Sequence, residues 1–111
     1  MTQEEIQQRS EQIALMKNYE ISENKECFKL PNKNGWIRLE EFYTDWEWLM
    51  EAVTFCKSKI GTPSSVKIAC LIACLNGDIN KALMTAEKEA VFIAVSNFAE
   101  LYNKGEIYGQ I

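Results

Sequence analysis

The sequence predicts an α+β fold, in which a small antiparallel sheet packs with two to three helices. Apolar residues recur at helical spacing over 45–60 and 85–103. Strand-like runs flank two Asn-Gly pairs, which readily form hairpin turns. The chain has 111 residues, of which 47% are hydrophobic. This length and composition predict a single domain over 1–111 with its own core.

The N-terminal segment predicts a helix over 1–17. Thr2 and Glu5 have the spacing of a capping box, in which each side chain satisfies the other's free backbone N–H group. The segment has few apolar residues, and most of them lie in its second half. We therefore expect its first two turns to fray.

Two short strands are expected next, over 27–30 and 36–39. Residues 22–25 are turn-like, and 31–35 contains proline, asparagine and an Asn-Gly pair. This pattern predicts an antiparallel hairpin.

The helix over 45–60 has the clearest start and stop signals. Thr44 is the expected N-cap, and Glu47 is its capping-box partner. Gly61 stands at the position of a left-handed C-cap, and Pro63 follows to prevent continuation.

The apolar run over 65–84 allows two interpretations. Its β-branched residues and the pair Asn76-Gly77 favour a second hairpin, with strands over 65–75 and 78–84. Apolar residues would then occupy both faces of the first strand. The alternative is a helix capped by Ser65 and ended by Gly77, since periodicity does not distinguish the two in a short apolar run.

The last predicted helix covers 85–103, with Gly105 as its C-cap and a loose tail over 106–111. Its apolar stripe and that of helix 45–60 are the strongest in the chain, and we expect them to face each other. The expected contacts join Trp46, Met50 and Val53 to Val91, Val95 and Phe98.

Composition excludes several function classes. The chain has no histidine and a net charge of −4, and no two of its Lys or Arg residues are adjacent. These features argue against histidine-based catalysis and against nucleic-acid binding. The N-terminus is acidic and no apolar window of about 18 residues is evident, so we expect no signal peptide, no membrane partner and a cytoplasmic location.

The four cysteines, Cys27, Cys56, Cys70 and Cys74, are expected to be reduced and buried among apolar residues. Only Cys70 and Cys74 are closely spaced, whereas a four-cysteine zinc site needs two such pairs. We expect no metal and no cofactor.

Two segments carry a family resemblance: 45–53, with Asp45-Trp46-Glu47-Trp48-Leu49-Met50, and 88–103, with Lys88-Glu89-Ala90-Val91 and Leu101-Tyr102-Asn103. They resemble DWxWLMxVV and KxEAVYxAVVxFIxWYN, the signatures of small uncharacterised Bacteroidetes proteins associated with phages and mobile elements. Here Phe92 replaces the usual tyrosine and Leu101 the usual tryptophan. The resemblance covers about the last 70 residues and implies helices on a small antiparallel sheet, with no known activity.

Several side chains lie outside the core-facing stripe of their helices, and we predict that they form an interaction surface. Trp48 points away from the expected core side of its helix, and Glu47 and Glu51 belong to an acidic cluster over 40–51 that contains no basic residue. In the last helix, Phe92 and Ile93 also fall outside one narrow stripe. The alternative is that these side chains belong to ordinary solvated helix faces or to the core.

No catalytic constellation is evident, so we expect a non-enzymatic interaction or accessory module with an unknown protein partner. The alternative function is a small-molecule-binding domain with a pocket between sheet and helices. Leftover apolar surface and open strand edges also predict a homodimer, with a monomer as the alternative.

Overall fold

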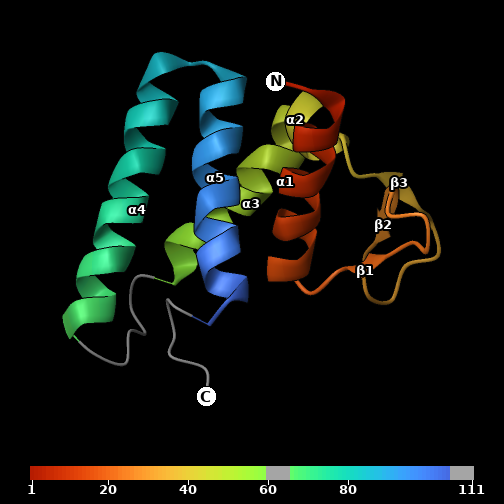
Figure 1. The fold of residues 1–111 in the computed structure, drawn as a ribbon, viewed down its shortest axis with the longest axis horizontal. Coiled ribbons are helices and arrows are strands. Elements are labelled where there is room, and N and C mark those ends of the chain that lie inside the picture. Colours follow the sequence, from red (N-terminus) through yellow and green to blue (C-terminus); the bar gives the residue numbers. More distant parts are fainter. Residues whose placement is uncertain (60–65, 106–111) are drawn as a thin grey trace.

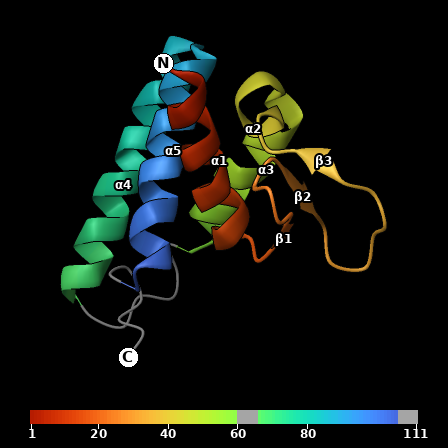
Figure 2. The ribbon, with the colours of Figure 1, turned by 45° about the vertical axis from the view of Figure 1, so that its right-hand side comes forward.

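Helix α5 (Lys88–Asn103) lies between α1 (Gln3–Met16) and α4 (Val66–Thr85) in the computed structural model, which describes residues 1–59 and 66–105 (Figure 1). Helix α3 (Trp46–Ser58) crosses α5 from behind, and a small three-stranded sheet lies beyond α1. A view turned by 45° shows the same order of helices, with the sheet projecting from the side that carries α2 and α3 (Figure 2). The predicted α+β class is therefore confirmed.

Helix α1 begins and ends at residues that satisfy its free backbone groups. Thr2 Oγ1 accepts a hydrogen bond from Glu5 N at 3.1 Å, which is one half of the predicted capping box. Asn18 has a φ of 61°, and Tyr19 N donates to Ala14 O just beyond the helix. Ile6, in the second turn, is only 8% exposed, so both halves of α1 contribute to the core.

The sheet consists of β1 (Glu20–Ile21), β2 (Cys27–Lys29) and β3 (Ile37–Arg38), all antiparallel. The predicted hairpin is confirmed by the pairing of Phe28 with Ile37, whereas β1 was not predicted. The expected turn over 22–25 is also present, since Lys25 N donates to Ser22 O. In the second loop the left-handed residue is Asn32, with a φ of 72°, rather than a residue of the Asn-Gly pair.

Helix α3 starts one residue later than predicted, at Trp46 instead of Asp45. Asp45, not Thr44, is the N-cap, and its Oδ1 accepts from Glu47 N at 2.9 Å. Thr44 instead ends α2 (Glu41–Thr44), a short helix that was not predicted. The helix ends at Ser58, and the expected Gly61 cap and Pro63 stop lie outside the described residues.

Helix α4 corrects the interpretation of 65–84 as a hairpin. The helical alternative is right about the conformation but wrong about the end, because the helix does not stop at Gly77 and runs on to Thr85. The expected Ser65 cap lies outside the described residues. Asn76 is 3% exposed and its Nδ2 donates to Ile72 O, so this side chain supports the helix instead of a turn. The β-branched residues Ile72 and Ile79 are buried on the side of α4 that contacts α5, and such packing overrides their preference for strands.

The turn from α4 into α5 is made by Ala86, whose φ is 58°. Thr85 Oγ1 accepts from Glu87 N at 3.2 Å and so stabilises this tight connection. The predicted helix over 85–103 therefore starts at Lys88. After it, Gly105 has the predicted left-handed conformation, with a φ of 76°. The tail over 106–111, expected to be loose, lies outside the described residues.

The core lies around α5, which contacts α1, α2, α3 and α4. Val53, Val91, Val95 and Phe98 are buried there, as predicted. Trp46 and Met50 were expected in the same contact, but they are 38% and 39% exposed, so this part of the prediction is wrong. The buried side of α3 is instead formed by Leu49, Ala52, Val53 and Cys56.

Candidate functional site

The outer side of α3 combines exposed apolar and acidic side chains, and we call Trp46, Glu47, Met50, Glu51 and Thr54 the α3 surface. An open recess of about 590 Å³ lies along this side. Its walls are Glu47, Trp48, Met50, Glu51 and Thr54, all from α3. Because one helix supplies all the described wall residues, helix geometry fixes the spacing of these side chains.

Trp48 forms the inner wall of this recess and is half-buried. Its indole meets the ring of Phe28 edge-on at 5.2 Å and that of Phe42 at 6.2 Å between ring centroids. The prediction treated Trp48 as the surface tryptophan and Trp46 as the core one. The structure places Trp46 farther out, because α2 and the sheet cover Trp48.

Glu47 and Glu51 are exposed and stand one helical turn apart. Within the described residues neither carboxylate has an ion pair or a capping role. Glu40 pairs with Arg38 at 3.0 Å, and the carboxylate of Asp45 caps α3. The acidic cluster thus divides into side chains that stabilise the fold and two that are available to a partner.

Phe92 and Ile93 do not belong to the α3 surface. Phe92 is completely buried, and its ring meets Tyr43 edge-on at 5.1 Å, so its assignment to an interaction surface is wrong. Ile93 is partly exposed but does not line the recess. The physical reason is that α5 has neighbours on several sides, and a helix in that position is apolar well beyond one stripe.

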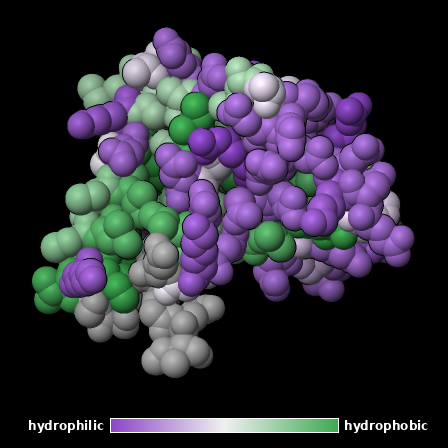
Figure 3. All heavy atoms as spheres, viewed as in Figure 1, coloured by the Kyte–Doolittle hydropathy of each residue, from purple (hydrophilic) through white to green (hydrophobic). Residues whose placement is uncertain are grey.

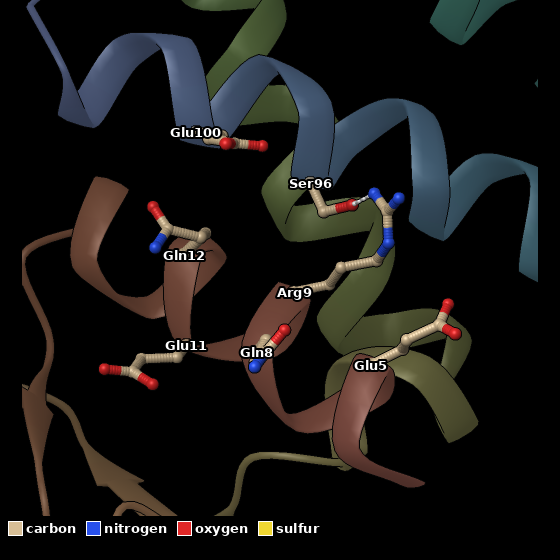
Figure 4. A pocket seen from close by; sticks show the side chains of 7 residues that line it. All are labelled: Glu5, Gln8, Arg9, Glu11, Gln12, Ser96 and Glu100. Carbon is tan, nitrogen blue, oxygen red and sulfur yellow. Dashed lines mark hydrogen bonds between the residues drawn. The ribbon is translucent and has the colours of Figure 1, made fainter. Parts of the chain in front are cut away.

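A second hollow of about 470 Å³ runs between α1 and α5 (Figure 4). Arg9 extends across it from α1, and its Nη1 donates to Ser96 Oγ at 2.7 Å and to Asn97 Oδ1 at 3.0 Å. The remaining walls are charged or amide side chains: Glu5, Gln8, Glu11, Gln12 and Glu100. Since Arg9 is engaged in joining two helices, this hollow resembles a solvated seam rather than a ligand pocket.

The predicted alternative was a pocket between sheet and helices. A hollow of about 160 Å³ does lie between α1 and β3, with Gln3, Gln7 and Arg38 among its walls. Among its described wall residues, Leu39 is the single apolar one. An organic ligand is usually held by mostly apolar walls, so this hollow does not favour the small-molecule interpretation.

Helix α4 carries an apolar surface that the hairpin interpretation concealed. Val66 and Met84 are 81% and 88% exposed, and Cys70, Ala73 and Cys74 are exposed between them. In a space-filling view, apolar residues gather on the flank where Figure 1 draws α4, and the opposite half is mostly polar (Figure 3). By length and composition alone α4 could span a membrane, and only 28% of its most apolar window is buried. The continuous apolar run over 68–75 was the signal in the sequence for the middle of this surface.

The cysteines differ in their surroundings, which corrects the expectation that all four are buried. Only Cys56 is fully buried, and burial raises the pKa of its thiol from 9.0 to about 12, since the thiolate would lose its hydration. Cys27 is half-buried, and Cys70 and Cys74 are exposed. The described part of the chain contains no cluster of three or more metal-ligating side chains.

Comparison with known proteins identifies no relative of this chain. Neither protein-family models, curated proteins nor solved structures give a significant match to this chain.

Proposed function

We propose that this chain is a non-enzymatic interaction module that docks a basic, partly apolar segment of another protein on the α3 surface. The observation that carries the proposal is the placement of Glu47 and Glu51, which form no ion pair within the described residues, beside exposed Trp46 and Met50. The resemblance to small phage-associated proteins, which implies no activity, is compatible with an accessory role of this kind.

The apolar side chains would supply most of the affinity. Tryptophan is enriched among the residues that dominate binding energy at protein interfaces, because it buries a large area with few rotatable bonds. Methionine is unbranched and flexible, and it adapts to partners of irregular shape. Trp48 gives the recess a rigid inner wall, since Phe28 and Phe42 hold its ring in place.

The carboxylates would select the sign of the partner's charge. Charged groups at the rim of an interface chiefly set specificity and the rate of association. Two glutamates one turn apart present negative charges that a Lys or Arg side chain can reach from either side. Because both are exposed, the attraction should weaken as salt concentration rises.

A direct test uses a short amphipathic Lys/Leu helix peptide as the probe, followed by tryptophan fluorescence of the intact chain. We expect Glu47→Lys/Glu51→Lys to weaken binding by about tenfold or more, because both rim charges are reversed. The matched control is Glu4→Lys/Glu23→Lys, which changes net charge equally at exposed sites elsewhere. We expect the control to stay within about twofold of the original affinity at physiological salt.

Two results would contradict the proposal. Equal weakening by both double variants would show that the peptide responds only to net charge. Retention of full affinity by Met50→Ser/Trp46→Ser would show that the apolar part of the α3 surface takes no part.

A further inference from the structure

The exposed side of α4 has the spacing of a helix–helix contact seam. Val66, Cys70, Ala73, Gly77 and Met84 follow one another at intervals of four, three, four and seven residues, and the interval of seven spans the polar Asn80. Apolar positions alternating by four and three form the seam along which two helices pack. The other side of α4 is already packed on α5, so this seam faces outward.

The seam is built from small side chains in its middle. Cys70, Ala73 and Cys74 are exposed, and a Cβ atom added at Gly77 would meet nothing within 4 Å. Small residues allow two helix backbones to approach closely. A helix that lies in a membrane surface instead presents bulky apolar and aromatic side chains. The composition of the seam therefore favours another helix over a lipid surface.

The geometry points to a second copy of this chain as the occupant, with the two α4 helices antiparallel across a two-fold axis near residue 72. In this arrangement a residue that precedes the axis in one α4 helix faces the residue that follows the axis by the same number of positions in the partner's α4 helix. Cys70 then lies opposite the partner's Cys74, since each is two residues from the axis. This two-fold contact repeats every interaction twice, as in most homodimers.

Charge complementarity selects the antiparallel arrangement. Lys67 lies five residues before the axis and Asp78 six residues after it, so Lys67 meets the partner's Asp78 to within one residue. At 100° per residue both side chains lie on the same flank of the seam, and an antiparallel contact brings equal flanks together. A parallel two-fold contact would instead place equal flanks on opposite sides of the seam and would separate Lys67 from the partner's Asp78. The α3 surface takes no part in this contact and remains available to other partners.

The oligomeric state is tested by light scattering over a concentration series. We expect the mass to rise from 12.8 kDa to twice that value. Ala73→Arg should remain at the single-chain mass, because it places two added charges near the axis. Gln8→Arg, an exposed change on α1, is the matched control and should still dimerise. A single-chain mass at every concentration for the original chain would overturn the inference.

The register is tested by cross-linking with diamide in a Cys27→Ser background, where two thiols lose two protons and two electrons to the reagent and form one disulfide. We expect covalent dimers from this parent chain and from an equal mixture of Cys70→Ser and Cys74→Ser variants. Each variant alone should give at least tenfold less. Efficient cross-linking of either variant with itself would overturn the antiparallel arrangement. So would binding to phosphatidylcholine/phosphatidylglycerol vesicles that Ala73→Arg abolishes.

Discussion

Phe28 joins the sheet to the helices through its ring. It is fully buried and stacks on Phe42 at 4.7 Å and on Tyr19 at 5.4 Å between centroids, and it meets Trp48 edge-on. These rings come from β2, from the residue that precedes β1, from α2 and from α3. A single side chain on a three-residue strand thus holds four segments together, which compensates for the shortness of the sheet.

Truncation of Phe28 to alanine should lower the free energy of unfolding by about 3–5 kcal/mol, because the ring leaves a cavity that its neighbours fill only in part. Urea denaturation measures the change. Trp36→Ala is the control, since this tryptophan is 48% exposed and lies under Lys29, and we expect it to cost less than about 1 kcal/mol. Similar losses for the two variants would show that the Phe28 cluster has no special role.

Cys56 should make stability depend on pH above 9. Burial raises its pKa in the folded chain from 9.0 to about 12, whereas the unfolded thiol ionises near 9. Between these values only the unfolded state loses its proton, so stability is fully present below pH 9 and falls as pH rises toward 12. We expect the stability difference between the original chain and Cys56→Ala to shrink by about 1 kcal/mol per pH unit over this window.

Urea denaturation at pH 8, 9 and 10 of the original chain and Cys56→Ala measures this effect. Other titrating groups act on both chains equally and cancel in the difference. Cys74→Ala is the control, because this thiol is exposed in the folded chain. A constant difference for Cys56→Ala across the series would refute the role given to its burial.

Helix α4 tolerates a glycine in its interior at a cost. Because Gly77 has no side chain, its backbone has more freedom in the unfolded chain than that of an alanine. In the folded chain a Cβ atom at this position would meet nothing within 4 Å. Gly77→Ala should therefore raise the free energy of unfolding by about 0.5–1 kcal/mol, measured at a concentration too low for self-association. Gly35→Ala is the control, because a Cβ atom at Gly35 would also meet nothing within 4 Å but this residue lies in a loop. We expect a smaller change in its free energy of unfolding. If Gly77→Ala were less stable than the original chain, this account of α4 would be wrong.

The contrast between α3 and α4 shows which elements a sequence can predict. Helix α3 carries its own signals, a cap residue and one apolar stripe, and it was predicted to within two residues at its C-terminal end. Helix α4 has mixed signals, because Asn76-Gly77 is a strong turn pair and several neighbours are β-branched. Packing on α5 decides its conformation, and that contact is not visible in a local pattern.

The interaction surfaces were harder to predict than the helices, because they depend on which side of each helix is covered. Glu47 and Glu51 were correctly expected at the surface, since charge is seldom buried. The roles of Trp46 and Trp48 were predicted the wrong way round, because α2 and the sheet cover Trp48 and leave Trp46 exposed. The position of α5 among its neighbours likewise buried Phe92. These outcomes are set by tertiary arrangement rather than by spacing along a helix.

The sheet and the helices share one continuous core. Buried residues run without interruption from Phe28 and Leu39 through Phe42 and Leu49 to the α5 residues around Phe98. The projecting sheet in Figure 2 is thus attached by side chains as well as by the chain itself. Parts that share a core lose stability together when any region of that core is disrupted.

The whole chain should therefore unfold in a single transition, and its own residues provide two independent probes. All three tryptophans lie within 36–48, beside the sheet and at the start of α3, so their fluorescence reports on that half. Most of the helical circular dichroism comes from α1, α4 and α5. We expect both signals to give the same urea midpoint, because the shared core makes separate unfolding unfavourable. Phe98→Ala, remote in sequence from every tryptophan, should lower both midpoints by the same amount. A fluorescence midpoint that stays unchanged while the helical midpoint falls would show that the sheet and the helices form independent cores.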